Sequence, residues 1–153
     1  MHKETKISSK EIFKGHVFRV TEDVVLLEND KEASREVVHH NGGVCVAALD
    51  EEDNLYFVRQ FRYAIGEEVL ELPAGKREKD EDPKLCGIRE LEEECGCKAA
   101  QFDLLTVMYP TVGYCSEIIH IYLAKDLTAT AQHLDEDEFL SVEKIPFSTA
   151  LEM

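Results

Sequence analysis

The sequence lacks any apolar run close to the roughly 20 residues that a membrane-spanning helix needs. Its first fifteen residues, MHKETKISSKEIFKG, are polar and mixed in charge, and they contain no apolar stretch that could serve as a secretory signal. We therefore expect a cytoplasmic protein with no membrane partner. With 44% hydrophobic and 32% charged residues, the 153-residue chain is typical of one globular domain that builds its core without disulfides.

Basic residues are also scarce. The chain has 17 Lys and Arg against 32 Asp and Glu, which gives a formal net charge of -15. Because nucleic acids are bound through clustered Lys and Arg, we expect no nucleic-acid partner. A small phosphorylated ligand is compatible with this charge if a divalent cation bridges the carboxylates and the phosphates.

The cysteines do not show the spacing of a zinc site or a disulfide framework. They are five in number, and only Cys95 and Cys97 lie close together in the chain. We interpret the cysteines as small buried apolar residues in a reducing compartment, with reactive thiols as the alternative.

Alternating apolar and β-branched residues predict strands on both sides of one marked helix. The expected strands cover residues 17–28, 33–40, 44–50, 55–63, 102–109, 117–124 and 138–145. The run DEDE at 135–138 has the composition of a solvated turn. After Pro146, Ser148 is a candidate cap for a further helix, which we expect to be cut short because the sequence stops five residues later.

The helix has clear start and stop signals. Asp82 is the expected N-cap, Pro83 suits the first turn, and Gly96 suits the position after the last turn. A projection at ~100° per residue gathers the apolar residues of this helix on one arc, which predicts its buried face. These residues are Leu85, Ile88, Leu91 and Cys95.

The opposite face of the same helix carries Glu90, Glu93 and Glu94, which we expect to be exposed. Arg89 precedes Glu93 by four residues and can pair with it. Gly87 projects beside Glu94, where its cost of roughly 1 kcal/mol in a helix interior predicts a close approach of backbone or ligand. Two interpretations are open: these glutamates only solvate the helix, or they bind a hard cation such as Mg²⁺ or Mn²⁺.

A longer pattern surrounds this helix. Gly75 is followed after five residues by Glu81, and after seven more by Arg89-Glu90-Leu91-Glu92-Glu93-Glu94-Cys95-Gly96. This run resembles the Nudix hydrolase signature G-x5-E-x7-R-E-U-x-E-E-x-G-U at every fixed position. Only the last position is loose, because Cys97 stands where the family usually has a bulky aliphatic residue.

The resemblance implies an α+β Nudix fold, a mixed β-sheet between α-helices with N-terminal antiparallel strands. Residues 1–153 would form a single domain, with the N-terminal strands over about 1–41 and a loop-helix-loop Nudix box over 75–97. Family members hydrolyse a nucleoside diphosphate linked to another moiety and use a divalent metal, here Mg²⁺ with Mn²⁺ possible.

Carried over position by position, the resemblance implies that Glu90 and Glu94 are the main metal ligands and that Glu93 is a ligand or base. Arg89 would orient the glutamates, and Glu81 would support the loop or a further metal. Such a metal would neutralise charge in the transition state and acidify the attacking water.

The segments VRQFRYAIGEEVLELPAGK and YPTVGYCSEIIHIYLAKDL resemble the ADP-ribose pyrophosphatase branch, which cleaves ADP-ribose to AMP and ribose 5-phosphate. In that branch Arg62 would contact phosphate, Ala74 would offer its carbonyl to metal, and Glu117, after the Gly113 loop, would activate water. The alternative for Arg62 is that it is only an exposed charge at the end of a strand. The alternative for Glu117 is that it only begins a strand and has no catalytic role. The branch usually has proline where this chain has Val112, which leaves other nucleoside diphosphate sugars open.

In this branch the N-terminal strands commonly form a homodimer whose partner contributes to the base pocket. Phe13, Phe18 and Arg35 are the candidates for stacking or charge contact, with strand packing as the alternative for either Phe. His39 and His40 are adjacent on a strand and point to opposite faces, so we assign them no site. The rival functions are a Nudix hydrolase of other nucleotide sugars or nucleoside triphosphates, and a non-catalytic nucleotide-sensing module.

Overall fold

The computed structural model describes residues 2–153, and the chain divides into two compact units. The first unit contains residues up to 42 and the segment 109–118, and the second contains residues 43–108 and 119–153. The single domain over residues 1–153 stays a prediction.

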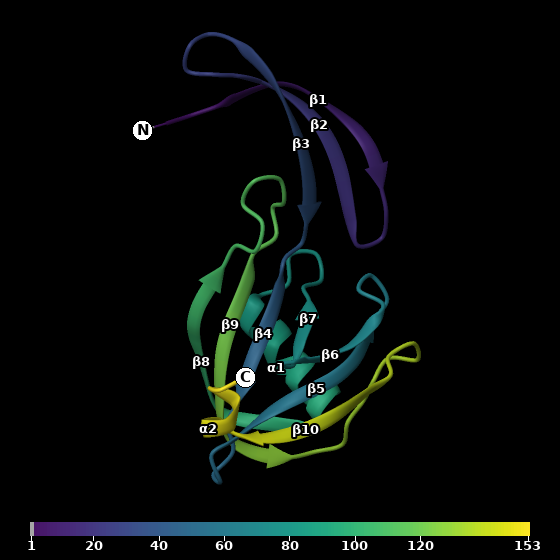
Figure 1. The fold of residues 1–153 in the computed structure, drawn as a ribbon, viewed down its shortest axis with the longest axis vertical. Coiled ribbons are helices and arrows are strands. Elements are labelled where there is room, and N and C mark those ends of the chain that lie inside the picture. Colours follow the sequence, from purple (N-terminus) through teal and green to yellow (C-terminus); the bar gives the residue numbers. More distant parts are fainter. Residues whose placement is uncertain (1) are drawn as a thin grey trace. The chain divides into compact units, whose positions relative to one another are not determined.

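The first unit is built on an antiparallel sheet of three strands in the order β1-β2-β3 (Figure 1). The strands are β1 (Thr5–Lys14), β2 (Phe18–Leu26) and β3 (Glu32–His40). Strand β1 was not predicted, because all ten of its residues are exposed and so leave no buried face in the pattern.

The segment 109–118 lies beside β3. The Val38 N–H donates to the Tyr114 carbonyl oxygen at 2.8 Å, and the Ser116 N–H donates to the Val38 carbonyl oxygen at 2.9 Å. These two backbone hydrogen bonds hold the loop that contains Gly113 and Glu117.

The second unit contains two sheets, in the orders β7-β4-β9-β8 and β10-β5-β6. The first sheet is mixed, because β4 and β9 are parallel while its other neighbours are antiparallel. Its strands are β7 (Ala74–Lys76), β4 (Gly43–Ala48), β9 (Ile119–Ala129) and β8 (Cys97–Met108). The other sheet consists of β10 (Leu140–Pro146), β5 (Asn54–Arg62) and β6 (Glu67–Glu71).

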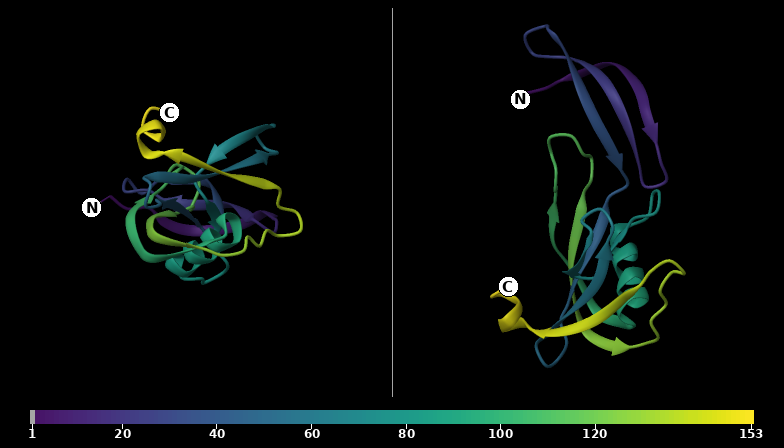
Figure 2. Two further views of the ribbon diagram at one scale, coloured as in Figure 1. Left: turned by 90° about the horizontal axis from the view of Figure 1, so that it is seen from below. Right: turned by 45° about the vertical axis from the view of Figure 1, so that its right-hand side comes forward.

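Helix α1 (Pro83–Cys95) packs against β4, β7 and β8 of the mixed sheet (Figure 2). The core between them is formed by buried residues of the helix and the sheet: Val44, Val46, Ala48, Cys86, Leu91, Cys97, Phe102, Tyr122 and Ala124. This core fixes the helix on the sheet and so positions the acidic segment. Over residues 2–153, all five cysteines are free thiols.

The second helix, α2 (Phe147–Ala150), is short. Pro146 occupies its N-cap position and no side chain caps it, so the prediction that Ser148 is the cap was wrong. Within the described residues, no helix is long and apolar enough to cross a membrane.

Candidate metal and phosphate site

The acidic helix α1 begins and ends where the sequence predicts. Asp82 Oδ1 accepts hydrogen bonds from the N–H groups of Lys84 (2.8 Å) and Leu85 (3.2 Å), and Pro83 occupies the first turn. Gly96 ends the helix in the left-handed conformation, with φ 59°, which glycine adopts without a steric penalty.

The predicted buried face of α1 was partly wrong: Leu91 is buried and Cys95 packs against the core as expected, but the other two residues are exposed. Leu85 and Ile88 are 63% and 38% exposed, whereas Glu90 and Glu94 are only 8% and 2% exposed. The helix therefore turns two of its carboxylates toward the sheet. The distribution of apolar residues alone did not decide which side of the helix is buried, because the side that carries these two carboxylates meets the backbone of β7.

Gly87 lies on this buried face, and its role is in packing. A Cβ added to Gly87 would lie 2.9 Å from the ring carbon Cζ of Phe102, closer than ordinary van der Waals contact. The predicted close approach therefore exists, but the approaching group is the aromatic ring of Phe102 on β8. The absence of a side chain at Gly87 lets the helix lie close to the mixed sheet.

The two buried carboxylates contact the backbone of β7. The Ala74 N–H donates to Glu94 Oε2 at 2.9 Å. A Cβ added to Gly75 would overlap the carboxylate of Glu90, so this position accepts only glycine while Glu90 stays where it is. Both carboxylates thus pack against the backbone of Ala74 and Gly75.

Arg89 links the remaining acidic groups of the box. Its Nε lies 3.2 Å from Glu81 Oε1, and its Nη1 lies 3.0 Å from Glu90 Oε1 and 2.8 Å from Glu93 Oε2. The predicted pair of Arg89 with Glu93 is confirmed. Burial alone would raise the pKa of Glu81, but hydrogen bonds from Arg89 and from the Glu78 N–H hold that pKa below its ordinary value.

Burial raises the pKa of Glu90 to about 7 and that of Glu94 to about 8. The Arg89 guanidinium and the Ala74 N–H oppose these shifts, whereas the charges of neighbouring carboxylates add to them. Among those neighbours is Glu138, on the acidic run that the sequence indicated to be only a solvated turn. The carboxylates of the site therefore outnumber the two guanidinium groups, of Arg89 and Arg62, that act on them.

This chemistry fits a hard divalent cation. All of the candidate side-chain ligands are carboxylate oxygens, which Mg²⁺ and Mn²⁺ prefer, and two of them are buried with strongly raised pKa values. Between residues 2 and 153, no three acidic, His or Cys side chains already converge as a complete metal-binding group. Mg²⁺ does not require such a group, because it keeps several waters and binds substrate phosphates.

Arg62 belongs to the second unit as well. Its Nε and Nη2 bind both oxygens of Glu71, at 2.6 and 3.0 Å, in a two-pronged pair. The hydrogen bond to Glu71 raises the pKa of Arg62 despite burial, and the charges of Glu94 and Glu138 add to this rise. Arg62 is therefore a fixed positive charge within electrostatic reach of the acidic site.

The other predicted residues lie in the first unit. Glu117 Oε1 is 3.3 Å from Nδ1 of His40. Arg35 is paired with Glu4 at 2.6 Å, and the rings of Phe18 and Phe13 lie 5.7 Å apart. The pairing of His40 with Glu117 was missed, because it joins residues that are far apart in the sequence.

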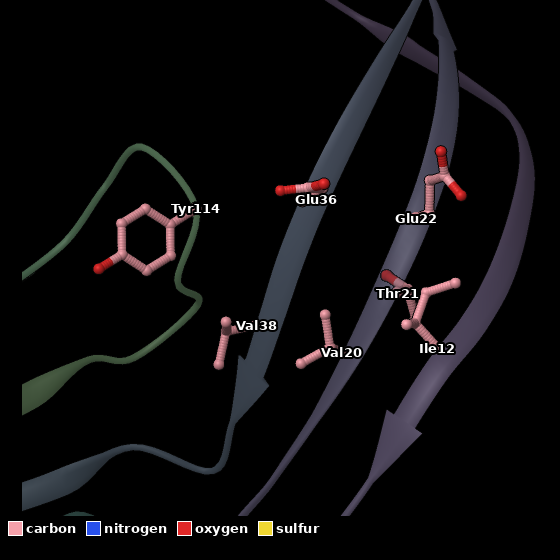
Figure 3. A pocket seen from close by; sticks show the side chains of 7 residues that line it. All are labelled: Ile12, Val20, Thr21, Glu22, Glu36, Val38 and Tyr114. Atoms are coloured by element: carbon pink, nitrogen blue, oxygen red, sulfur yellow. The ribbon is translucent and has the colours of Figure 1, made fainter. Parts of the chain in front are cut away.

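The first unit also has an open hollow of about 430 Å³ (Figure 3). It is lined by Ile12, Val20, Thr21, Glu22, Glu36, Val38 and Tyr114. Two carboxylates in this lining make the hollow unsuited to phosphate, and the predicted substrate contacts Phe18, Arg35 and Gly113 are not among its lining residues.

The fold and the acidic helix together place the protein in a structural class: proteins in which a mixed sheet carries a loop-helix-loop segment with buried carboxylates. The chain belongs to the Nudix family, because the family model described as NUDIX domain matches residues 39–153. The predicted family and fold class are therefore confirmed.

Known proteins resemble the chain over nearly its full length. It is 38% identical to a protein named ADP-ribose pyrophosphatase from Bacillus subtilis (strain 168), covering 98% of this chain and 82% of that protein. It is also 38% identical to a methanol dehydrogenase activator from Bacillus methanolicus, covering 99% and 83%. A crystal structure of an ADP compounds hydrolase matches the fold with a TM-score of 0.85 at 21% identity, covering 99% of this chain and 83% of that one.

The raised pKa values predict how the stability of the metal-free protein depends on pH. Folded Glu90 and Glu94 hold protons that the unfolded chain, with a carboxyl pKa near 4.5, has lost, so between about pH 5 and 8 the folded state binds more protons. The free energy of unfolding should therefore rise as the pH falls from 8 to 5.5, by up to about 5 kcal/mol, of which Glu94 contributes the larger part. Urea denaturation in EDTA measures this.

The variant Glu94→Gln should lose much of that pH dependence, because its amide does not titrate. The matched control is Glu136→Gln, which removes a charge from an exposed position and should leave the dependence unchanged. An unaltered slope in Glu94→Gln would contradict the assignment of the titration to this buried carboxyl group.

Proposed function

We propose that the protein is a magnesium-dependent pyrophosphohydrolase that cleaves ADP-ribose to AMP and ribose 5-phosphate. The chain is a Nudix hydrolase. The observation that carries the proposal is the pair of buried carboxylates, Glu90 and Glu94, held against the backbone of Gly75 and Ala74. The likeness to a protein named ADP-ribose pyrophosphatase over 98% of the chain supports this substrate.

Glu90 and Glu94 would hold the cation, with Glu93, Glu81 and the carbonyl group of Ala74 as further candidates. When bound, Mg²⁺ neutralises charge on the phosphate oxygens and lowers the pKa of a water that it carries. Arg89 keeps Glu81, Glu90 and Glu93 in place through the ion pairs described above. Arg62, fixed by Glu71, is a positive charge for the diphosphate.

Three carboxylates are candidates for activating the attacking water. Glu93 is tied to Arg89 and 36% of its side chain is exposed. Glu138 acts electrostatically on both Glu90 and Glu94, which supports a place for it at the same site. Glu117 is a candidate through the resemblance to the branch.

We propose that the first unit contributes substrate contacts through Phe18, Arg35 and Gly113, and that it mediates a homodimer in the cytoplasm. The exposed apolar side chains of β1 support an interface there: Ile7, Ile12 and Phe13 are 51%, 54% and 51% exposed. A monomeric mass by light scattering across micromolar concentrations would contradict the dimer.

The test of the function is product identification. With ADP-ribose and Mg²⁺, we expect AMP and ribose 5-phosphate in equal amounts, because water attack breaks the one phosphoanhydride bond. GDP-mannose, ADP-glucose and a nucleoside triphosphate serve as competitors, and EDTA and Glu94→Gln should abolish turnover. Chromatography of the products gives the result.

A faster reaction with another nucleotide sugar would retain the site chemistry and reject ADP-ribose, which is the alternative that Val112 leaves open. Absence of turnover for every substrate, with nucleotide binding preserved, would support the non-catalytic module instead.

The general base is tested by separate substitutions of Glu138 and Glu117. We expect Glu138→Gln to lower kcat by ~100-fold, the scale of general acid-base catalysis, because its charge reaches the carboxylate pair. Glu117→Gln should lower kcat less. Steady-state kinetics against Mg²⁺ measures both, with Glu136→Gln as the control on the same acidic run, and the reverse ranking would assign water activation to Glu117.

A further inference from the structure

The side chain of Cys86 contacts the guanidinium of Arg89. Cys86 is fully buried, and its Sγ is 3.5 Å from Arg89 Nη2, which donates to it. The thiol in turn donates to the carbonyl oxygen of Lys76 at 3.6 Å, and it also interacts with the carboxylate of Glu81. One small side chain thus joins the loop before the helix to the arginine that holds the acidic groups.

Arg89 has little freedom in this arrangement. Its Nη2 is placed between Glu81 Oε2 (3.3 Å), the carbonyl oxygen of Lys76 (3.5 Å) and the sulfur of Cys86. The guanidinium is planar, so fixing Nη2 also fixes Nη1, the atom that meets Glu90 and Glu93. Replacing a group that contacts Nη2 should therefore also shift Nη1, and with it the carboxylates of two candidate metal ligands, Glu90 and Glu93.

The thiol suits this position for chemical reasons. Burial, together with the hydrogen bond to Glu81, raises the pKa of Cys86 to about 12, so the group stays neutral and adds no negative charge. Sulfur is both a weak donor and a weak acceptor, so it can receive the N–H of Arg89 while donating to an oxygen. The three-residue spacing of Cys86 and Arg89 puts them on one side of the helix.

We propose that Cys86 is a positioning residue: by holding the Arg89 guanidinium against Glu81 and Lys76, it sets the orientation of the carboxylates of Glu90 and Glu93. The catalytic part of this inference rests on the proposed function. The effect on cation binding does not, because it concerns the carboxylates in the absence of substrate.

A purely structural role makes a different prediction. Cys86 is also part of the core that contains Leu91 and Phe102. If it only fills space, the apolar variants Cys86→Ala and Cys86→Val should be tolerated better than Cys86→Ser, which buries a hydroxyl group. If it positions Arg89, serine should preserve function better, because serine alone keeps a donor and an acceptor.

The experiment compares these three variants with wild type by Mn²⁺ binding to the free protein, followed by electron paramagnetic resonance, and by kinetics against Mg²⁺. Cys86→Ala and Cys86→Val should weaken Mn²⁺ binding and raise the half-maximal Mg²⁺ concentration, each by about tenfold, the lower range for partners of metal ligands. Cys86→Ser should stay within about threefold of wild type. Melting temperatures are recorded in parallel.

The matched control is Cys97→Ala, which removes a thiol from the same core on β8 and should leave Mn²⁺ binding unchanged. Wild-type Mn²⁺ affinity in Cys86→Ala or Cys86→Val would overturn the proposal, as would losses that follow the melting temperatures rather than the hydrogen-bonding groups. If wild type does not hydrolyse ADP-ribose, the proposed function fails, but the ranking of Mn²⁺ affinities still tests the role of Cys86.

Discussion

The structure of the site depends on one constraint: the carboxylates of Glu90 and Glu94 are buried against the backbone of β7, and a side chain at Gly75 would displace that of Glu90. Glu90 and Glu94 are 8% and 2% exposed, and Gly75 leaves the space that Glu90 fills. Taking charged carboxylates out of water is costly unless they are paired, protonated or bound to a cation. The metal-free site therefore holds protons near neutral pH, and cation binding would replace them.

Other features of α1 hold the two carboxylates in this position. Asp82 and Gly96 fix the ends of α1, and Gly87 lets the helix approach Phe102 closely enough for its carboxylates to reach β7. Arg89 balances part of the negative charge and is itself held by Glu81. The helix propensity lost at Gly87 is thus offset by the packing that it permits.

The bounds of α1 and the ion pair of Arg89 with Glu93 could be predicted from the sequence, because cap residues and the i,i+4 spacing act locally. The buried face of α1 could be predicted only for Leu91 and Cys95; Leu85 and Ile88 are exposed, because the orientation of the helix also follows from the strand that meets it. Strand β1 was missed because exposure removes its periodicity. The influence of Glu138 required tertiary structure, because the acidic run that contains it is far from the box in sequence.

The most direct test of this account is the number of protons released when Mg²⁺ binds at pH 7. Isothermal titration in buffers of different ionisation enthalpy measures it. Because the pKa of Glu90 is about 7 and that of Glu94 about 8, the account predicts release of about one proton per bound ion, and much less in Glu94→Gln. Binding of Mg²⁺ without proton release, or equal release in Glu94→Gln, would contradict the central claim that the cation binds at the buried carboxylates.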